Sequence, residues 1–204
     1  MSAADMARAR RLLMRRDPAL SALMKRVGRC GLSDSRTREP FEALVRAILS
    51  QQLSIHAAAT IYRRVAALAS VDGRLSPASL LAVDRDALRA AGVSRPKIVY
   101  LCDLAERVLD GRLDLHALES CDDEAVVTAI TAVRGLGRWS AEMFLMFRLN
   151  RPDVFPVGDL GIVKGVQKLL GMKGRPAPRT MLRVAEAWRP YRSVAAWYLW
   201  RLHD

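Results

Sequence analysis

Apolar residues recur at helical spacing along most of the chain. One clear run places Phe41, Leu44, Val45, Ile48 and Leu49 at the i, i+3, i+4, i+7, i+8 positions of a broad apolar helix face. The alternation of apolar and polar residues that is typical of half-buried strands is nearly absent. Similar periodicity predicts further helices at about 55–69, 98–109, 124–133, 139–147, 160–170, 179–188 and 191–203. The pattern therefore indicates an all-α protein of about ten helices joined by short loops.

The length of the chain is suited to one domain. Its 204 residues, of which 51% are hydrophobic, can form a sizeable core in one domain or in two small, closely packed lobes. No internal repeat and no low-complexity tract interrupts residues 1–204. The one stretch rich in Pro and Gly, Gly171–Pro178, is interpreted as an exposed basic loop and not as a domain linker.

The excess of positive charge indicates which classes of partner the protein binds. Thirty-three Lys and Arg against 21 Asp and Glu leave a formal charge of +12, which attracts polyanions at long range. Nucleic acid is the first candidate partner, and an acidic membrane surface is the second. No segment approaches 18 uninterrupted apolar residues, so no spanning helix is expected.

The N-terminus and the cysteines exclude several classes of protein. Residues 1–17 lack the apolar core of a secretory signal; they resemble a mitochondrial presequence only weakly and predict an amphipathic first helix. Cys30, Cys102 and Cys121 are far apart in sequence and form no CxxC pair. A disulfide framework, a zinc site and a four-cysteine iron–sulfur cluster are therefore unsupported. We expect a cytoplasmic protein, associated with the nucleoid in a bacterium or nuclear in a eukaryote.

A glycine-rich turn joins two of the predicted helices. Gly135 and Gly137 tolerate positive φ and close backbone approach, while Leu136 between them would fill the gap between the helices. The exposed N–H groups at the start of the second helix suit an anion such as a DNA phosphate. Taken alone, this turn is more typical of an ordinary αα-hairpin with a glycine cap.

An aspartate follows this hairpin by about twenty residues. In the loop 152–160, Pro156 and Gly158 deliver Asp159 to the predicted start of a helix. Aspartate commonly caps helices, and the helix dipole favours a negative charge at that end. A capping role and a catalytic role are compatible, because a fixed carboxylate can stabilise a cationic transition state.

Several of these segments together resemble one family. The run VRGLGRWSAEMFLMF followed by FPVGDLGIVKG resembles the helix-hairpin-helix (HhH-GPD) DNA glycosylase superfamily, in its AlkA/MAG-like 3-methyladenine branch. The segments SQQLS (50–54), KIVYLCDLA (97–105) and RPYRSVAAWYLWRL (189–202) resemble that branch too. The similarity runs from about Pro40 to the C-terminus, roughly four-fifths of the chain. It implies a two-lobed all-α fold, a hairpin over about 124–148 and an active-site cleft between the lobes. The residues before Pro40 leave no room for the N-terminal β domain of some bacterial members.

The resemblance assigns the chemistry to Asp159. Cleavage of an N-glycosidic bond builds positive charge on the sugar, which a carboxylate stabilises while it orients or deprotonates water. Lyase-type relatives have a nucleophilic lysine where this chain has Trp139, so hydrolysis without strand cleavage is expected. No cofactor and no catalytic metal is implied; a structural monovalent cation at the hairpin is compatible with the resemblance.

The resemblance also indicates an aromatic base pocket. Trp139 and Trp200 match pocket positions, and an indole attracts a cationic alkylated purine by about 0.5–2 kcal/mol. Trp197 is assigned either to the pocket or to the core, and Trp188 to the core. Met143 stands where some relatives have a pocket tyrosine, which leaves the preferred lesion open.

The DNA-binding residues are assigned by the same resemblance. Gln52 or Leu53 is the candidate wedge that fills the gap left by a flipped base, with helix–loop packing as the alternative. Phosphate contacts are expected from Gly135, Gly137, Arg138, Lys164 and Lys168. The three histidines His56, His116 and His203 show no metal-ligand spacing and receive no role.

The sequence thus predicts a monomeric, monofunctional glycosylase that excises alkylated purines from double-stranded DNA. The alternatives are a non-catalytic helix-hairpin-helix module, a glycosylase for another damaged base, a helix-turn-helix regulator and a strand-cutting lyase. The non-catalytic module leaves Asp159 and the Trp139/Trp200 pair without a purpose. The lyase requires the lysine that Trp139 replaces.

Overall fold

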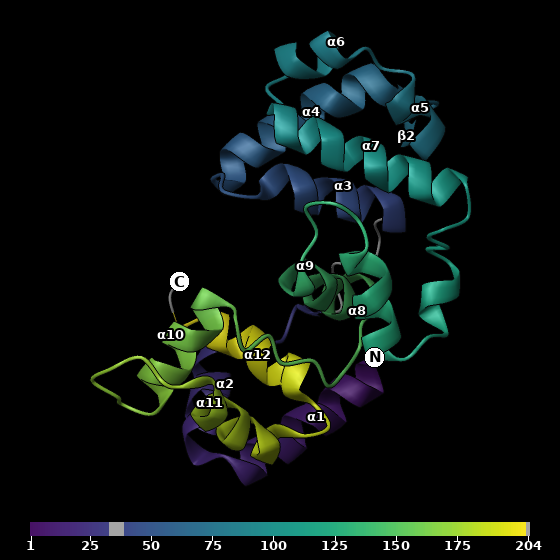
Figure 1. Ribbon diagram of the computed structural model, residues 1–204. Helices are drawn as coiled ribbons and strands as arrows, with labels where there is room; N and C mark the ends of the chain where they lie inside the picture. The colour runs from purple at the N-terminus through teal and green to yellow at the C-terminus, as the bar shows by residue number, and fades with distance from the viewer. Residues whose placement is uncertain (33–38, 203–204) are drawn as a thin grey trace. The chain divides into compact units, whose positions relative to one another are not determined.

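The computed structural model describes residues 1–32 and 39–202, which form two compact units (Figure 1). The first unit comprises Met1–Thr37 and Leu145–Asp204, and the second comprises Arg38–Phe144. Helices dominate both units, so the all-α prediction is confirmed. Within the described ranges, no helix has the length and hydropathy of a membrane span.

The first unit gathers helices from both ends of the sequence. It contains α1 (Ala3–Arg16), α2 (Pro18–Val27), α10 (Leu160–Leu169), α11 (Pro178–Ala185), the 3-10 turn η4 (Glu186–Trp188) and α12 (Arg192–Trp200). Helix α12 packs against α1, α2 and α10, as Figure 1 shows in yellow beside purple and green. Trp188 is fully buried within this unit, which confirms its assignment to the core. Its indole Nε1 donates to Asp17 Oδ2 at 2.8 Å, and the other oxygen of Asp17 caps α2.

The second unit is built from consecutive segments. It contains α3 (Pro40–Ser50), α4 (Ile55–Ala69), α5 (Pro77–Leu81), α6 (Arg85–Ala90), α7 (Arg95–Leu109), the 3-10 turn η2 (Ala117–Glu119), α8 (Asp123–Thr131) and α9 (Arg138–Met143). The apolar stripe predicted from Phe41 to Leu49 is buried at all five positions. The predicted helix at 55–69 has the same bounds in the structure.

Three local features differ from the prediction. A two-stranded hairpin pairs β1 (Ser70–Val71) with β2 (Arg74–Leu75), because Asp72 and Gly73 both adopt the positive φ of a tight primed turn. The helix predicted at 139–147 changes after Met143 into one π-helical turn, η3 (Phe144–Arg148). The last helix ends at Trp200, and the predicted endpoint His203 lies outside the described residues.

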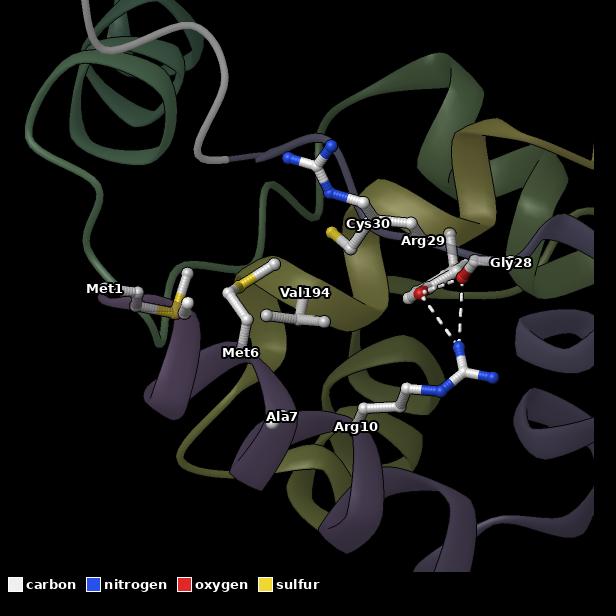
Figure 2. A pocket seen from close by; sticks show the side chains of 10 residues that line it. Met1, Met6, Ala7, Arg10, Gly28, Arg29, Cys30 and Val194 are labelled. Atoms are coloured by element: carbon white, nitrogen blue, oxygen red, sulfur yellow. Dashed lines mark hydrogen bonds between the residues drawn. The ribbon is translucent and has the colours of Figure 1, made fainter.

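The first unit also contains a cavity of about 600 Å³ (Figure 2). Its lining includes Met1, Met6, Arg10, Cys30 and Tyr198, and none of the predicted site residues. Arg10 donates to the carbonyl oxygen of Gly28 at 2.9 Å, so its guanidinium closes the end of α2. This cavity is therefore separate from the residues to which the sequence assigns chemistry.

Candidate active site

The loop that precedes Asp159 is anchored to the start of α12. Arg192 donates from Nε and Nη2 to the two carboxylate oxygens of Asp153, at 2.8 and 2.9 Å. The backbone N–H of Val154 donates to the hydroxyl of Ser193 at 2.9 Å, and Ser193 is fully buried. A paired guanidinium and a buried hydroxyl fix the entrance of the loop more firmly than a surface ion pair would.

The carboxylate of Asp159 is held by two donors. As the N-cap of α10, it accepts the N–H of Ile162 on Oδ1 at 2.8 Å, which confirms the predicted capping role. The indole Nε1 of Trp200 donates to the same Oδ1, also at 2.8 Å. Because the donors come from α10 and from the end of α12, the orientation of this carboxylate depends on the packing of both helices.

Two glycines allow these helices to approach each other. A Cβ added at Gly161 would lie 2.6 Å from Cδ1 of Trp200, and one at Gly165 would lie 2.8 Å from Cβ of Leu199. Both distances are too short for a real contact. The sequence alone indicated no role for these glycines, although their i, i+4 spacing is visible in the run GDLGIVKG.

Trp200 has a structural partner on its ring as well. Phe147 of η3 stacks on its indole, with ring centroids 5.7 Å apart and an interplanar angle of 25°. The ring nevertheless stays partly exposed. Trp200 was predicted to form a wall of the base pocket. In the structure, the same side chain has a second role, because it orients Asp159.

Trp197 is buried, with 8% of its surface exposed. Its ring lies edge-on to Tyr198, and the guanidinium of Arg201 lies 4.4 Å above its centroid. Of the two assignments that the sequence left open, this environment favours the core.

The hairpin between α8 and α9 has the predicted glycine turn with one correction. Gly135 adopts φ +78°, and Leu136 is buried as expected. Gly137, however, has a negative φ of −107° and acts as the N-cap of α9. Only the first glycine therefore uses the left-handed region. Glycine is also required at position 135 for steric reasons, because a Cβ there would lie 2.1 Å from the ring of Tyr100 on α7.

The remaining pocket candidates lie on α9, in the second unit. Trp139 is 44% exposed and Met143 is half-buried one helical turn later. A tryptophan exposed to this degree is unusual, because burial of its large apolar ring is favourable. Trp139 is thus an accessible aromatic surface next to the hairpin turn.

The three predicted cationic contacts differ in their surroundings. Arg138 forms ion pairs with Glu124 and, at 3.4 Å, with Glu142, and the Arg138 guanidinium lowers the pKa of Glu124. Lys168 donates to the carbonyl oxygen of Leu202 at 2.8 Å. Lys164 is exposed one turn after the first residue of α10. Two of the three side chains thus already have protein partners, which sequence spacing did not reveal.

The two wedge candidates occupy the loop between α3 and α4. Gln52 and Leu53 are both exposed, and Gln52 has a positive φ of 57°. Their exposure is not what the packing alternative predicts.

No group of three or more His, Cys, Asp or Glu side chains in the described ranges could hold a metal ion.

Comparisons with known proteins find similar DNA glycosylases. DNA-3-methyladenine glycosylase 1 of Schizosaccharomyces pombe is 36% identical over 165 residues, which cover 80% of this chain and 72% of that protein. The solved 3-methyladenine DNA glycosylase of the same yeast, in complex with abasic DNA, superposes with a TM-score of 0.85 at 35% identity and covers 95% of both chains. A DNA-3-methyladenine glycosidase from Bacillus halodurans gives a TM-score of 0.81 at 40% identity, over 93% of this chain and 86% of that one.

The family assignment rests on a longer match than the hairpin alone. Residues 45–190 match the HhH-GPD superfamily of base excision DNA repair proteins. This span includes the α3–α4 loop, the glycine turn and Asp159, and it ends just before α12. The chain belongs to the HhH-GPD superfamily of base excision DNA repair proteins.

Proposed function

We propose that this protein hydrolyses the N-glycosidic bond of alkylated purines in double-stranded DNA, in base excision repair. The observation that carries the proposal is the carboxylate of Asp159, which two N–H donors hold in one orientation at the N-terminus of α10. The names of the similar yeast and bacterial proteins support the same activity.

The chemistry follows from the charge that develops during bond cleavage. As the base departs, the sugar becomes cationic, and a preoriented carboxylate stabilises that charge without reorganising. The same group can orient or deprotonate the attacking water. Trp139, at the position where lyase-type relatives have a lysine, has no amine for a covalent adduct, so the product is an intact strand with an abasic site.

The substrate class follows from the aromatic surface and the charge of the chain. N-alkylation of a purine leaves a positive charge on the base, and the exposed indole of Trp139 offers it a cation–π contact. The formal charge of +12 favours the DNA backbone as a partner. We propose methylated purines of the 3-methyladenine and 7-methylguanine type as substrates for a monomeric, cofactor-independent enzyme.

One assay tests both the reaction and its product. The protein is incubated with methylated duplex DNA, free bases are separated and identified, and strand breaks are counted before and after alkali. We expect released methylpurines and breaks that appear only after alkali. Binding without released base would favour a non-catalytic DNA-binding module, and breaks without alkali would indicate a lyase.

A further inference from the structure

The loop that carries the two wedge candidates has an unfavourable backbone conformation. Gln52, at φ +57°, lies in the left-handed region that side chains other than glycine rarely adopt. Such a conformation persists where the surrounding structure holds it in place. The contacts that hold this loop therefore determine where Gln52 and Leu53 point.

Lys97 supplies two of these contacts. From the first turn of α7, its Nζ donates to the carbonyl oxygens of Leu49 at 2.7 Å and Gln51 at 2.8 Å. These carbonyls lie at the C-terminal end of α3, where a positive charge also interacts favourably with the helix dipole. The ammonium group thus closes the helix and fixes the residue just before Gln52.

A further contact connects the loop to the glycine turn. The side chain of Gln51 donates from Nε2 to the carbonyl oxygen of Gly135 at 2.7 Å. Gly135 in turn packs against the ring of Tyr100, which lies one turn after Lys97 on α7. Helix α7 therefore holds the wedge loop through Lys97 and the hairpin turn through Tyr100, and Gln51 joins the two.

We infer that Lys97 is a positioning residue that sets the wedge loop at a fixed offset from the glycine turn, where a phosphate contact is predicted. This inference rests on the proposed function. A side chain inserted into the base stack must be placed relative to a backbone phosphate, and the connection through Lys97 and Gln51 supplies that placement within the second unit. The hydrogen bonds that Lys97 forms with the described residues go to the carbonyl oxygens of Leu49 and Gln51, so its loss should impair base extrusion and leave the hydrolytic step unchanged.

The test compares two DNA duplexes that differ in how hard the lesion is to extrude. One holds an alkylated purine in a normal pair, and the other holds it opposite an abasic position, where unpairing costs less. For Lys97→Met we expect the single-turnover excision rate on the paired lesion to fall on the order of tenfold, as for a misplaced positioning group. On the unpaired lesion we expect the rate to stay nearly unchanged. Lys97→Arg, which retains charge and donors, should restore the rate.

Two controls separate positioning from loss of charge or of folding. Lys173→Met removes an equal charge from the exposed basic loop and should leave both rates unchanged. Gln51→Met removes only the contact to Gly135 and should reproduce the selective loss, even if Lys97→Met folds poorly. Equal losses on both duplexes, or no loss in either variant, would overturn the inference.

A binding readout keeps the inference independent of catalysis. The fluorescence of 2-aminopurine, placed beside an abasic site in duplex DNA, reports unstacking when the wedge enters. We expect the wild-type protein to raise this signal and Lys97→Met to lose most of the rise at saturating protein. If the wild-type protein releases no alkylated base, the proposed function fails, and this signal alone decides the role of Lys97; an undiminished rise would reject it.

Discussion

The indole N–H of Trp200 and the backbone N–H of Ile162 donate to the same oxygen of Asp159, each at 2.8 Å. From the sequence, Asp159 and Trp200 are predicted to have separate roles, Asp159 as the catalytic carboxylate and Trp200 as a wall of the base pocket. The structure joins these roles, because the aromatic side chain that is predicted to contact the base also fixes the direction of the carboxylate.

Replacement of the carboxylate should remove catalysis and keep the fold. Asp159→Asn retains the shape and an oxygen that can accept both N–H donors, but it loses the negative charge. We expect excision to fall by about 10²–10³-fold or more, as for loss of a transition-state stabilising group. Binding to abasic DNA, measured by fluorescence anisotropy, should remain near the wild-type level. Activity close to wild type in this variant would refute the assigned mechanism.

Replacement of Trp200 tests whether its N–H orients the carboxylate. Trp200→Phe keeps an aromatic ring that can stack on Phe147 and removes the donor to Asp159. We expect single-turnover excision to fall by roughly 10–100-fold, because a carboxylate that loses the donor from α12 is less well oriented.

Trp188 provides a matched control for that variant. Its indole also donates to an aspartate, Asp17, at 2.8 Å, but it is buried in the core of the first unit. Trp188→Phe should lower the free energy of unfolding by about 1–3 kcal/mol, with the rate per folded molecule little changed. If the two variants behave alike in both measurements, Trp200 has a structural role only.

The close approach of α10 and α12 can be tested at Gly165. An added Cβ would lie 2.8 Å from Cβ and 2.9 Å from the backbone oxygen of Leu199, so Gly165→Ala must push the helices apart. We expect a loss of about 1–3 kcal/mol in thermal unfolding, together with slower excision because Trp200 moves away from Asp159. Gly174→Ala, where no atom lies within 4 Å, is the control and should have neither effect. A stable, fully active Gly165→Ala protein would show that the close contact between α10 and α12 is not required.

The salt dependence of DNA binding should distinguish two of the cationic candidates, Lys164 and Arg138. Lys164→Ala should lower the slope of log K against log[salt] by about one, as expected for one lost phosphate contact. Arg138→Ala should change it less, because Glu124 and Glu142 already compensate its charge. Titrations between low and moderate salt measure these slopes. An unchanged slope in Lys164→Ala would show that DNA does not contact this face of α10.

Much of the local structure could be predicted because it depends on neighbouring residues. The bounds of α4, the buried stripe of α3 and the capping role of Asp159 follow from periodicity and from a capping preference within one helical turn. The positive φ of Gly135 is local in the same sense. The change to a π-turn after Met143 was missed, since no helix-breaking residue marks it in the sequence.

The functional residue types were also determined by the sequence, but their partners were not. That Asp159 follows a glycine hairpin is a matter of spacing, and the resemblance to the HhH-GPD superfamily rests on residues that can be read in order. By contrast, the hydrogen bond between Trp200 and Asp159 joins residues 41 positions apart in the sequence. The hydrogen bond between Gln51 and Gly135 joins residues 84 positions apart. Only the packing of α12 on α10, and of the α3–α4 loop on the hairpin, brings these groups within 3 Å. The sequence thus predicted which residues carry the chemistry, and the tertiary structure decided their orientation, because hydrogen bonds between distant segments depend on how whole helices pack.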